Sequence, residues 1–412
     1  MTLFSEIFEP RSLIVKWDNV LEIPEFKKLE TTEQNPYWHG EGNVMNHTKA
    51  VVEEIYKMYP IDDSDYVFSH GPAAERYHKR IVMVLAALFH DIGKGETTRW
   101  SEAKGTWESP HHASASEKIA RRLLWDEDFM IRELVCNLVG NHMKPLYIFK
   151  SDNPIAKVIE LSENIVSLKA LFDLKTADCL GAKMQEYDGW DEQLERAKEI
   201  ALDYGCFYES YKFFNLFTRR NFYNTGELDN KNNIDGWDEP NSPFLVHMLI
   251  GLPGSGKSTL RNNIISQSEK EIPVICRDEI RTEIGIGGEK PMGTKEQEKQ
   301  VTEIANGRIL ECARKRQSFI IDQTSLNKYY REQFRELLKE YNPIFIYHYV
   351  EAATFEETIK RRDGQIDREV IERMQRNFDF PRHSECEMMF IYKEGRSYIE
   401  HLFMPRIEEK FS

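Results

Sequence analysis

The sequence predicts two domains, an all-helical one followed by an α/β domain built on a parallel sheet. In the first half, apolar residues recur at helical spacing, whereas after residue 243 short continuous apolar runs alternate with helical stretches. Between them, residues 224–242 are rich in Asn, Asp and Gly, as expected of a linker. We therefore predict a first domain over residues 1–223, a linker over 224–242 and a second domain over 243–412, within the two or three domains that 412 residues suggest.

The first domain is expected to be a helical bundle with little strand content. Six stretches carry apolar residues at helix-like spacing, and Gly or Pro falls between them. The predicted helices are Val44–Met58, Arg76–Phe89, Ala113–Leu124, Phe129–Asn141, Ile155–Asn164 and Ser167–Ala182.

The second domain alternates buried strands with helices, which favours a parallel sheet. The predicted strands are Phe244–Ile250, Pro273–Cys276, Ser318–Ile321 and Ile344–Val350, with helices at Glu298–Arg316 and Lys328–Glu340.

Composition restricts the possible partners and location. The net charge is −14, and most of the acidic excess lies before residue 243, which argues against salt-driven binding of long nucleic-acid tracts. A short strand end held in a local pocket remains compatible with that charge. Because no apolar run could span a bilayer, the start of the chain lacks a signal-like segment and the six cysteines are scattered, we expect a cytoplasmic protein with no membrane association.

The first candidate site is a set of histidines and aspartates. His90-Asp91 lies in the segment Leu88-Phe-His-Asp-Ile-Gly-Lys94, and the other members are His47, His112, His142 and Asp178. Imidazole and carboxylate together suit a divalent transition metal, although a lone histidine on an apolar face is more often a packed core residue. Eight of the twelve histidines fall within the first 150 residues, which favours a metal site.

These residues resemble the HD phosphohydrolase superfamily over roughly residues 39–180. The resemblance implies that His47, His90, Asp91 and Asp178 hold one divalent metal. Asp91 would bridge to a second metal held by His112 and His142, with His111 as an adjacent competitor for the role of His112. Whether one or two metals bind is left open. Lys94 is a candidate contact to a substrate phosphate.

The second candidate site is a glycine-rich loop, Gly251-x4-Gly256-Lys257-Ser258, between a predicted strand and a helix. Such a loop cradles phosphates with its amides, while its lysine reaches the β- and γ-phosphate oxygens and its serine binds Mg²⁺. We expect it to bind ATP or another nucleoside triphosphate with Mg²⁺. The expected binding residues are Gly251, Pro253, Gly254, Ser255, Gly256, Lys257, Ser258 and Thr259. The loop alone does not separate an ATPase from a kinase.

Three later segments resemble the 5′-OH polynucleotide kinases. They are Arg277-Asp-x-x-Arg281, Asp322-x-Thr324-x-Leu-Asn327 followed by Arg331, and the arginine-bearing segment Arg361–Arg368. The resemblance implies that Asp278 is the general base and that Arg281 grips the acceptor phosphate. Arg362 and Arg368 are candidate lid arginines whose register with Arg361 stays open.

Further roles are less defined by that resemblance. Asp322 either holds a metal-bound water or contacts the acceptor, and Thr324, Asn327 and Arg331 are candidate substrate contacts. The alternative interpretation of Asp278 and Arg281 is a surface helix ion pair.

Together the two sites resemble the bacterial HD-domain/polynucleotide kinase end-healing enzymes. That resemblance implies ATP-dependent phosphorylation of 5′-OH ends and metal-dependent removal of a 2′,3′-cyclic phosphate or a 2′- or 3′-phosphate. The expected partners are RNA or DNA strand ends, with a separate ligase acting afterwards. Two alternatives are an enzyme that acts on free nucleotides and nucleosides, and a nucleotide-sensing regulatory ATPase with an HD effector module.

Overall fold

The chain folds into two compact units, Met1–Tyr211 and Lys212–Ser412. The computed structural model describes residues 3–9, 12–60, 72–165, 167–186, 189–228, 244–286, 293–394 and 396–398. Helix α12 (Leu216–Thr225) groups with the second unit, so the division falls before the boundary at residue 223 that we predicted. Arg219 explains the difference, because its guanidinium donates to the carbonyls of Cys386 (2.9 Å) and His383 (2.6 Å). The predicted linker 224–242 lies outside the described residues from residue 229 onward.

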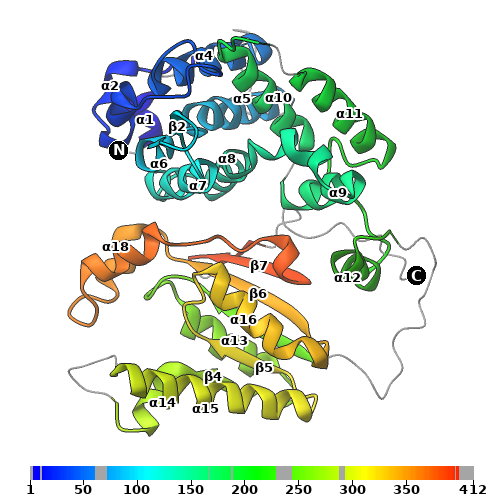
Figure 1. Cartoon of the computed structure of the whole chain (residues 1–412). Coiled ribbons are helices and arrows are strands. Elements are labelled where there is room, and N and C mark those ends of the chain that lie inside the picture. The colour runs from blue at the N-terminus through cyan, green and yellow to red at the C-terminus, as the bar shows by residue number, and fades with distance from the viewer. Residues whose placement is uncertain are drawn as a thin grey trace. The chain divides into compact units, whose positions relative to one another are not determined.

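The first unit is helical, as predicted, with one exception (Figure 1). Its helices are α1 (Leu3–Ile7), α2 (Trp17–Leu21), α3 (Pro24–Lys27), α4 (Val44–Met58), α5 (Pro72–Phe89), α6 (Lys94–Thr97), α7 (His112–Leu123), α8 (Phe129–Asn141), α9 (Pro154–Asn164), α10 (Leu168–Gly181) and α11 (Trp190–Asp203). The exception is a two-stranded antiparallel hairpin, β1 (Arg99–Ser101) and β2 (Thr106–Glu108), which the helical periodicity did not anticipate.

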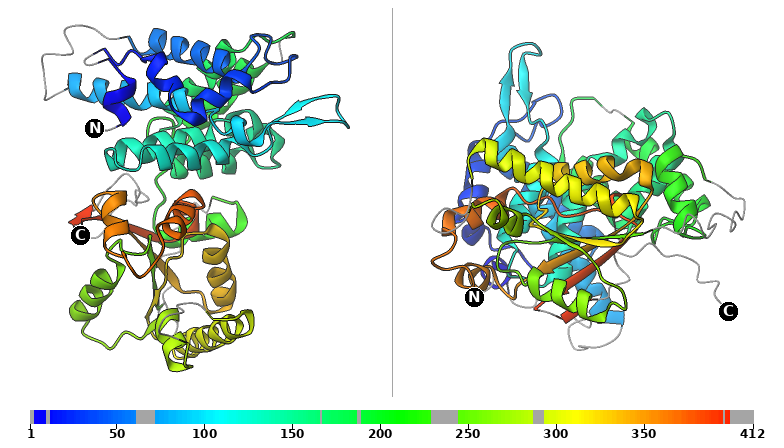
Figure 2. Two further views of the ribbon diagram at one scale, coloured as in Figure 1. Left: turned by 90° about the vertical axis from the view of Figure 1, so that its left-hand side faces the viewer. Right: turned by 90° about the horizontal axis from the view of Figure 1, so that it is seen from below.

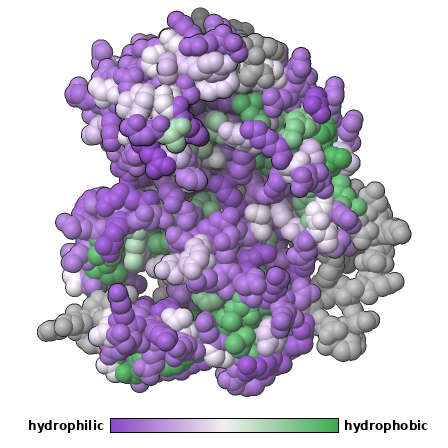
Figure 3. Space-filling view, in the orientation of Figure 1, coloured by the Kyte–Doolittle hydropathy of each residue, from purple (hydrophilic) through white to green (hydrophobic). Residues whose placement is uncertain are grey.

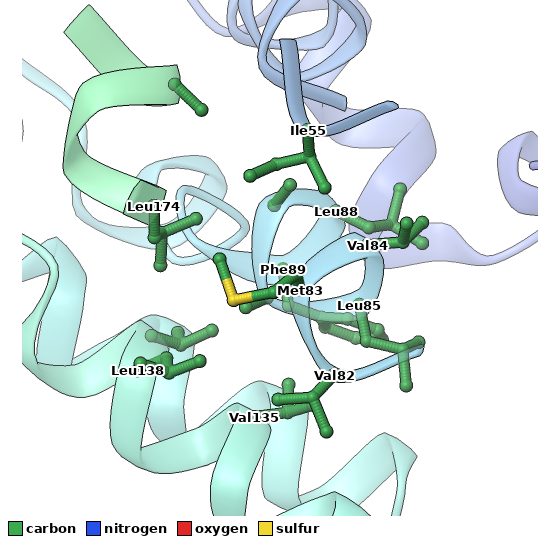
Figure 4. Close-up of a cluster of buried hydrophobic side chains, with 14 of the residues drawn as sticks. Ile55, Val82, Met83, Val84, Leu85, Leu88, Phe89, Val135, Leu138 and Leu174 are labelled. Atoms are coloured by element: carbon green, nitrogen blue, oxygen red, sulfur yellow. The ribbon is translucent and has the colours of Figure 1, made fainter. Parts of the chain in front are cut away.

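The second half of helix α5, residues 81–89, lies in the core of this unit, which explains its uninterrupted apolar sequence. Val84, Leu88 and Phe89 are fully buried or nearly so. Figure 4 shows them among Ile55 of α4, Val135 and Leu138 of α8, and Leu174 of α10. Burial continues past the end of α5 to Lys94, so the His90-Asp91 pair is delivered into the interior.

The second unit is built on one sheet with the strand order β4-β5-β3-β6-β7-β8. The first five strands in that order are parallel, and β8 is antiparallel to β7. The strands are β3 (Leu245–Ile250), β4 (Val274–Cys276), β5 (Phe319–Asp322), β6 (Ile344–Glu351), β7 (Met388–Lys393) and β8 (Arg396–Tyr398). The helices are α12, α13 (Lys257–Gln267), α14 (Arg277–Glu283), α15 (Lys295–Arg314), α16 (Lys328–Leu338), α17 (Phe355–Lys360) and α18 (Arg368–Arg376). The four predicted strands are present, whereas β7 and β8 were not predicted.

The strand order places the candidate phosphate site at a topological switch point. Strand β3 lies between β5 and β6 in the sheet, and both of these strands come after it in the sequence. In open parallel sheets, ligands bind beyond the carboxyl ends of the strands where the order reverses. The glycine loop follows β3 at this point, while Asp278 follows β4 and Asp322 ends β5.

Neither the cysteines nor the surface alters the expectations from composition. All six cysteines are buried, and none is joined in a disulfide within the described part of the chain. No helix among the described residues is both long and apolar enough to cross a membrane. On the face shown in Figure 3 most of the surface is hydrophilic, with hydrophobic residues in small separate groups.

Candidate metal centre and phosphate-binding site

Four histidines in the first unit direct the same ring atom toward two aspartates. They come from α4 (His47), the end of α5 (His90), the start of α7 (His112) and the residue after α8 (His142). The Nε2 atoms of His47 and His90 lie 3.3 Å apart, as do those of His112 and His142. Two Nε2 atoms at this distance are better placed to bind one cation together than to bind each other. The two pairs therefore fit two metal sites.

The other ring nitrogen of each histidine is held by the surrounding chain. Nδ1 donates to a backbone carbonyl in three of them: to Ala87 from His90 (2.7 Å), to Ser109 from His112 (2.8 Å) and to Val139 from His142 (2.7 Å). In His47, Nδ1 lies 3.0 Å from Oε1 of Glu41. Anchoring Nδ1 in this way directs the Nε2 lone pair inward and fixes the tautomer that binds metal.

Asp91 lies between the two histidine pairs in a bridging arrangement. Its Oδ2 is 3.3 Å from Nε2 of His90, while its Oδ1 is 3.4 Å from His112 and 3.7 Å from His142. Oδ1 is buried and accepts no hydrogen bond within the described part of the chain. A buried carboxylate oxygen normally has a partner, and a cation held by Asp91, His112 and His142 would supply it. These three residues form one potential metal group, and His47, His90 and Asp91 form another.

Asp178 completes the group that contains His47 and His90, since its Oδ1 is 2.9 Å from Nε2 of His47. Two buried lysines oppose the carboxylates: Lys94 lies 2.7 Å from Asp91, and Lys175 lies 2.7 Å from Asp178. Burial alone would raise the pKa of each aspartate, but the ammonium and imidazole groups outweigh it and hold both values well below the usual range. Both carboxylates are therefore ionised, as cation binding requires.

The structure distinguishes among the predicted residues of this centre. His112 rather than His111 joins the cluster, because His111 is exposed in a left-handed conformation at the start of α7. Gly93 allows α7 to approach, since a Cβ there would lie 2.5 Å from the carbonyl oxygen of His112. Lys94, predicted to contact a substrate phosphate, binds Asp91 (2.7 Å) and Gln34 (2.8 Å) in this structure.

Glu41 and Lys175 were not predicted as members of this centre. Glu41 is hydrogen-bonded to His39 (2.8 Å) and lies 3.0 Å from Nδ1 of His47, and Lys175 precedes Asp178 by three residues. Only the spacing of Lys175 from Asp178, one helical turn, could have indicated its contact from sequence.

In the second unit, the glycine loop is shaped for anion binding. Gly251 has φ of +156°, and a Cβ there would lie 2.3 Å from the carbonyl oxygen of Val350, so only glycine fits. The loop leads directly into the N-terminus of α13, whose free amides and dipole favour phosphate. Oγ of Ser255 is buried with no hydrogen-bond partner among the described residues, as expected of a group that a ligand would satisfy.

Lys257 faces into this loop and toward the other predicted groups. Its ammonium donates to the carbonyls of Gly251 (2.9 Å) and Leu252 (2.8 Å). Burial lowers the pKa of Lys257 to about 8, an effect that Asp322 and Asp278 oppose and Arg362 reinforces. These three charged groups come from the end of β5 and from the segments that follow β4 and β6, at the same edge of the sheet as the glycine loop.

The Asp278–Arg281 pair lies on α14 beside α15. Arg281 pairs with Asp278 and is held by Glu298, whose two carboxylate oxygens accept from Nε (2.8 Å) and Nη2 (2.9 Å). Glu298 also accepts from Arg277 (3.0 Å), and these arginine contacts lower its pKa to about 2 despite the opposing effect of burial. The carboxylate of Asp278 is 88% exposed and accessible to an acceptor. Glu298 was not predicted, because it lies 17 residues after Arg281.

The predicted lid arginines separate into two positions. Arg361 donates to the carbonyl of Gly254 (3.2 Å), and the Arg362 side chain lies beside the same glycine. Arg368 is exposed and pairs with Glu356 and Glu372 (2.8 Å) at the start of α18.

The residues predicted to contact the acceptor have different partners in the structure. Asp322 is paired with Arg261 of α13 (2.9 Å), a residue that we did not predict. Thr324 accepts from the amide of Gly251 (3.0 Å), and the side chain of Asn327 caps α16.

The prediction that Arg331 contacts substrate is not met. Its side chain is fully buried, and its guanidinium donates to both carboxylate oxygens of Glu385 (2.7 and 3.2 Å). It also donates to the carbonyls of Ser325 (3.0 Å) and Asp379 (2.9 Å). Arg331 therefore anchors the loop after β5 rather than facing a ligand.

Comparison with known proteins gives two domain matches along the chain. Residues 40–171 match the family model described as HD domain, and residues 246–381 match the one described as AAA domain. The first match contains the four histidines and Asp91 of the metal centre but ends before Asp178, and the second contains the glycine loop and the segments with Asp278, Asp322 and Arg362.

Solved structures share limited similarity with the chain. A chain of a Pnkp1/Rnl/Hen1 complex is 23% identical, with 30% of this chain and 41% of that chain covered and a TM-score of 0.27. A putative kinase from Chloroflexus aurantiacus J-10-fl is 16% identical (37% and 86% covered, TM-score 0.30). A sugar kinase from Janibacter sp. HTCC2649 is 15% identical (37% and 87% covered, TM-score 0.28). These values are too low to indicate a substrate.

The fold and the domain matches define the class of protein. An HD domain with clustered histidines and aspartates is followed by a P-loop kinase-like domain with a parallel sheet. The chain is thus a kinase-like and phosphohydrolase-like protein, whose P-loop implies a nucleoside triphosphate and Mg²⁺ and whose HD domain implies divalent metal.

Proposed function

We propose that this protein heals broken nucleic-acid ends. The second unit transfers a phosphoryl group from ATP to a 5′-OH strand end, and the first removes a 2′,3′-cyclic phosphate or a 2′- or 3′-phosphate. The observation that carries the proposal is that Asp278, with Arg281 one helical turn further along α14, lies at the same carboxyl edge of the sheet as the P-loop. Asp278 is among the charged groups that influence Lys257, and its carboxylate is exposed, while Arg281 is pre-oriented by Glu298.

Each group of the kinase site has a defined task in this proposal. Lys257 and the loop amides bind the triphosphate, and Ser258 binds its Mg²⁺. Asp278 orients the 5′ hydroxyl and accepts its proton, while Arg281 binds the phosphate next to the acceptor nucleoside. Arg362, beside Gly254, stabilises negative charge on the transferred group, and Arg368 reaches the site only if the segment between them closes.

In the first unit, the residues themselves set up hydrolysis of a phosphoester. His47, His90, Asp91 and Asp178 would hold one cation, and Asp91, His112 and His142 a second. When bound, such ions polarise a phosphoryl oxygen and lower the pKa of water. Asp91 and Asp178 remain ionised, and the anchored imidazoles keep Nε2 directed inward. Lys94, which contacts Asp91, provides positive charge beside the position of the phosphate.

The test uses one oligonucleotide that carries a 5′-OH and a 2′,3′-cyclic phosphate, incubated with ATP and a divalent metal. Mapping both ends should show a new 5′-phosphate and a cleared 3′ end. Lys257→Ala and Asp278→Ala should abolish only the first reaction, and Asp91→Ala only the second, because the residues lie in different units. Efficient phosphorylation of free nucleosides instead of strand ends would favour a small-molecule kinase. The absence of transfer to any acceptor would favour a nucleotide-sensing ATPase.

A further inference from the structure

The β1–β2 hairpin, which shortly precedes His112 in the chain, carries two tryptophans. Trp100 and Trp107 are direct cross-strand partners, with ring centroids 5.4 Å apart and a steep angle of 77° between the rings. Trp100 is 45% exposed, and Trp107 is partly exposed. Both views in Figure 2 show the hairpin extending away from the helices of its own unit.

Hydrogen bonds connect the base of this hairpin to a metal-binding residue. The hydroxyls of Thr98 and Ser109, which flank the two strands, lie 2.7 Å apart. The carbonyl of Ser109 accepts from Nδ1 of His112 (2.8 Å). Trp107 precedes Ser109 by two residues, so extended backbone places the two Cα atoms about 7 Å apart.

His112 also lies where the metal centre reaches the surface. Its side chain is 14% exposed, compared with 0% for His47 and His90, 1% for His142 and 2% for Asp91. Asp178 is next, at 9%, so His112 is the most exposed of the residues proposed to hold metal. The base of the hairpin, which is bonded to His112 through Ser109, therefore adjoins the most exposed ligand of the centre.

The charge of the protein limits how a strand end could be held there. The net charge is −14, so long-range attraction does not favour a polyanion. The hairpin itself carries Arg99 and Lys104 against Glu102 and Glu108, with Lys104 paired to Glu108. Stacking of bases on aromatic rings needs no such attraction and tolerates any sequence.

We propose that Trp100 and Trp107 form a stacking site for an unpaired nucleobase near the 3′ end of the strand whose terminal phosphate is hydrolysed at the metal centre. This inference rests on the proposed function of the first unit. A cross-strand tryptophan pair also stabilises a hairpin, so the test must separate recognition of a base from loss of structure.

The experiment compares two oligonucleotides with a 3′-terminal cyclic phosphate, one with all bases present and one with abasic residues at its last positions. For Trp100→Ala and Trp107→Ala, we expect KM for the intact strand to rise about five- to 150-fold, the equivalent of 1–3 kcal/mol per stacked base. KM for the abasic strand should already be high in the unmodified protein and should not rise further. Trp100→Phe should retain part of the effect. Tyr208→Ala, which removes a side chain 67% exposed elsewhere in the unit, should change neither KM.

Each contrary result has its own meaning. Equal losses on both strands, or loss of bound metal in Trp100→Ala, would show that the tryptophans only support His112 and would overturn the stacking site. Unchanged KM values in both tryptophan variants would also overturn it while leaving the proposed function intact. If the unmodified protein processes neither strand, the proposed function fails and the stacking site falls with it.

Discussion

Glu298 should control acceptor recognition without touching the acceptor. Its carboxylate holds Arg281 through two charge-assisted hydrogen bonds of 2.8 and 2.9 Å. The side chains of Arg281 and Glu298 are 11% and 21% exposed, so solvent screens the pair partly and the lower end of the range, about 1.5 kcal/mol, applies. In Glu298→Ala the guanidinium retains Asp278 as its partner but loses its fixed orientation.

The expected result is an increase of about tenfold in KM for a 5′-OH oligonucleotide, since about 1.4 kcal/mol corresponds to a factor of ten. The requirement for ATP should change little. The side chain of Glu298 contacts Arg277, Arg281 and the amide of Gly293, and within the described residues it contacts no residue of the glycine loop that binds the triphosphate. Arg281→Ala should raise the same KM about ten- to 100-fold. The matched control is Glu296→Ala, an exposed glutamate in the first turn of the same helix.

A double-mutant cycle separates orientation from an independent contribution. If Glu298 acts through Arg281, adding Glu298→Ala to Arg281→Ala should raise KM by less than about twofold. Fully additive effects, or an unchanged KM in Glu298→Ala alone, would refute the positioning role. Denaturant unfolding of each variant checks that the second unit remains folded.

Three further predictions concern the metal centre and the sheet. Asp91→Ala should lose both metals, whereas His142→Ala should mainly lose one; full occupancy in Asp91→Ala, measured by elemental analysis, would contradict the bridging arrangement. Glu41→Gln should weaken metal affinity about 10- to 100-fold through His47, and equal affinity in a competition titration would count against this support. His348 and His383 are buried, which lowers both pKa values to about 3, so the unfolded chain takes up protons first as pH falls below about 6.5. Both histidines lie in the second unit, whose unfolding transition is the one that MgATP should shift. The free energy of unfolding of this unit should fall by up to about 2.7 kcal/mol per pH unit, and a midpoint that does not change between pH 7 and 5 would disprove the prediction.

Much of the fold follows from local sequence. Helices α4 and α8 have the predicted bounds, because their apolar periodicity coincides with the N-capping side chains of Asn43 and Asp128. Strands β3 and β6, of six and eight residues, are apolar runs typical of a buried parallel sheet, and β4 and β5 are shorter apolar runs of the same kind. Strands β1, β2 and β8 have three residues each and, unlike β4, are not apolar runs, and β7 and β8 lie beyond the last predicted strand.

The candidate sites divide in the same way. The histidines and aspartates of the metal centre and the glycine loop have spacings that indicate chemistry without a structure. Arg331 looked like a substrate contact for the same reason, yet its partner is Glu385, 54 residues further along the chain. Glu41 and Glu298 could not be predicted because what defines them is a contact with a residue on another element.

The sequence by itself determined the two kinds of fold, their order, and which residues are chemically able to bind metal and phosphate. Only the tertiary structure decided that His112 rather than His111 joins the cluster, that Asp91 lies between the two histidine pairs, and that Arg331 is buried. The physical reason is that periodicity, capping and turn chemistry act over a few residues, whereas desolvation and charge pairing depend on neighbours brought together by folding. A side chain's chemical type is therefore readable from the sequence, but its role depends on which groups surround it after the chain has folded.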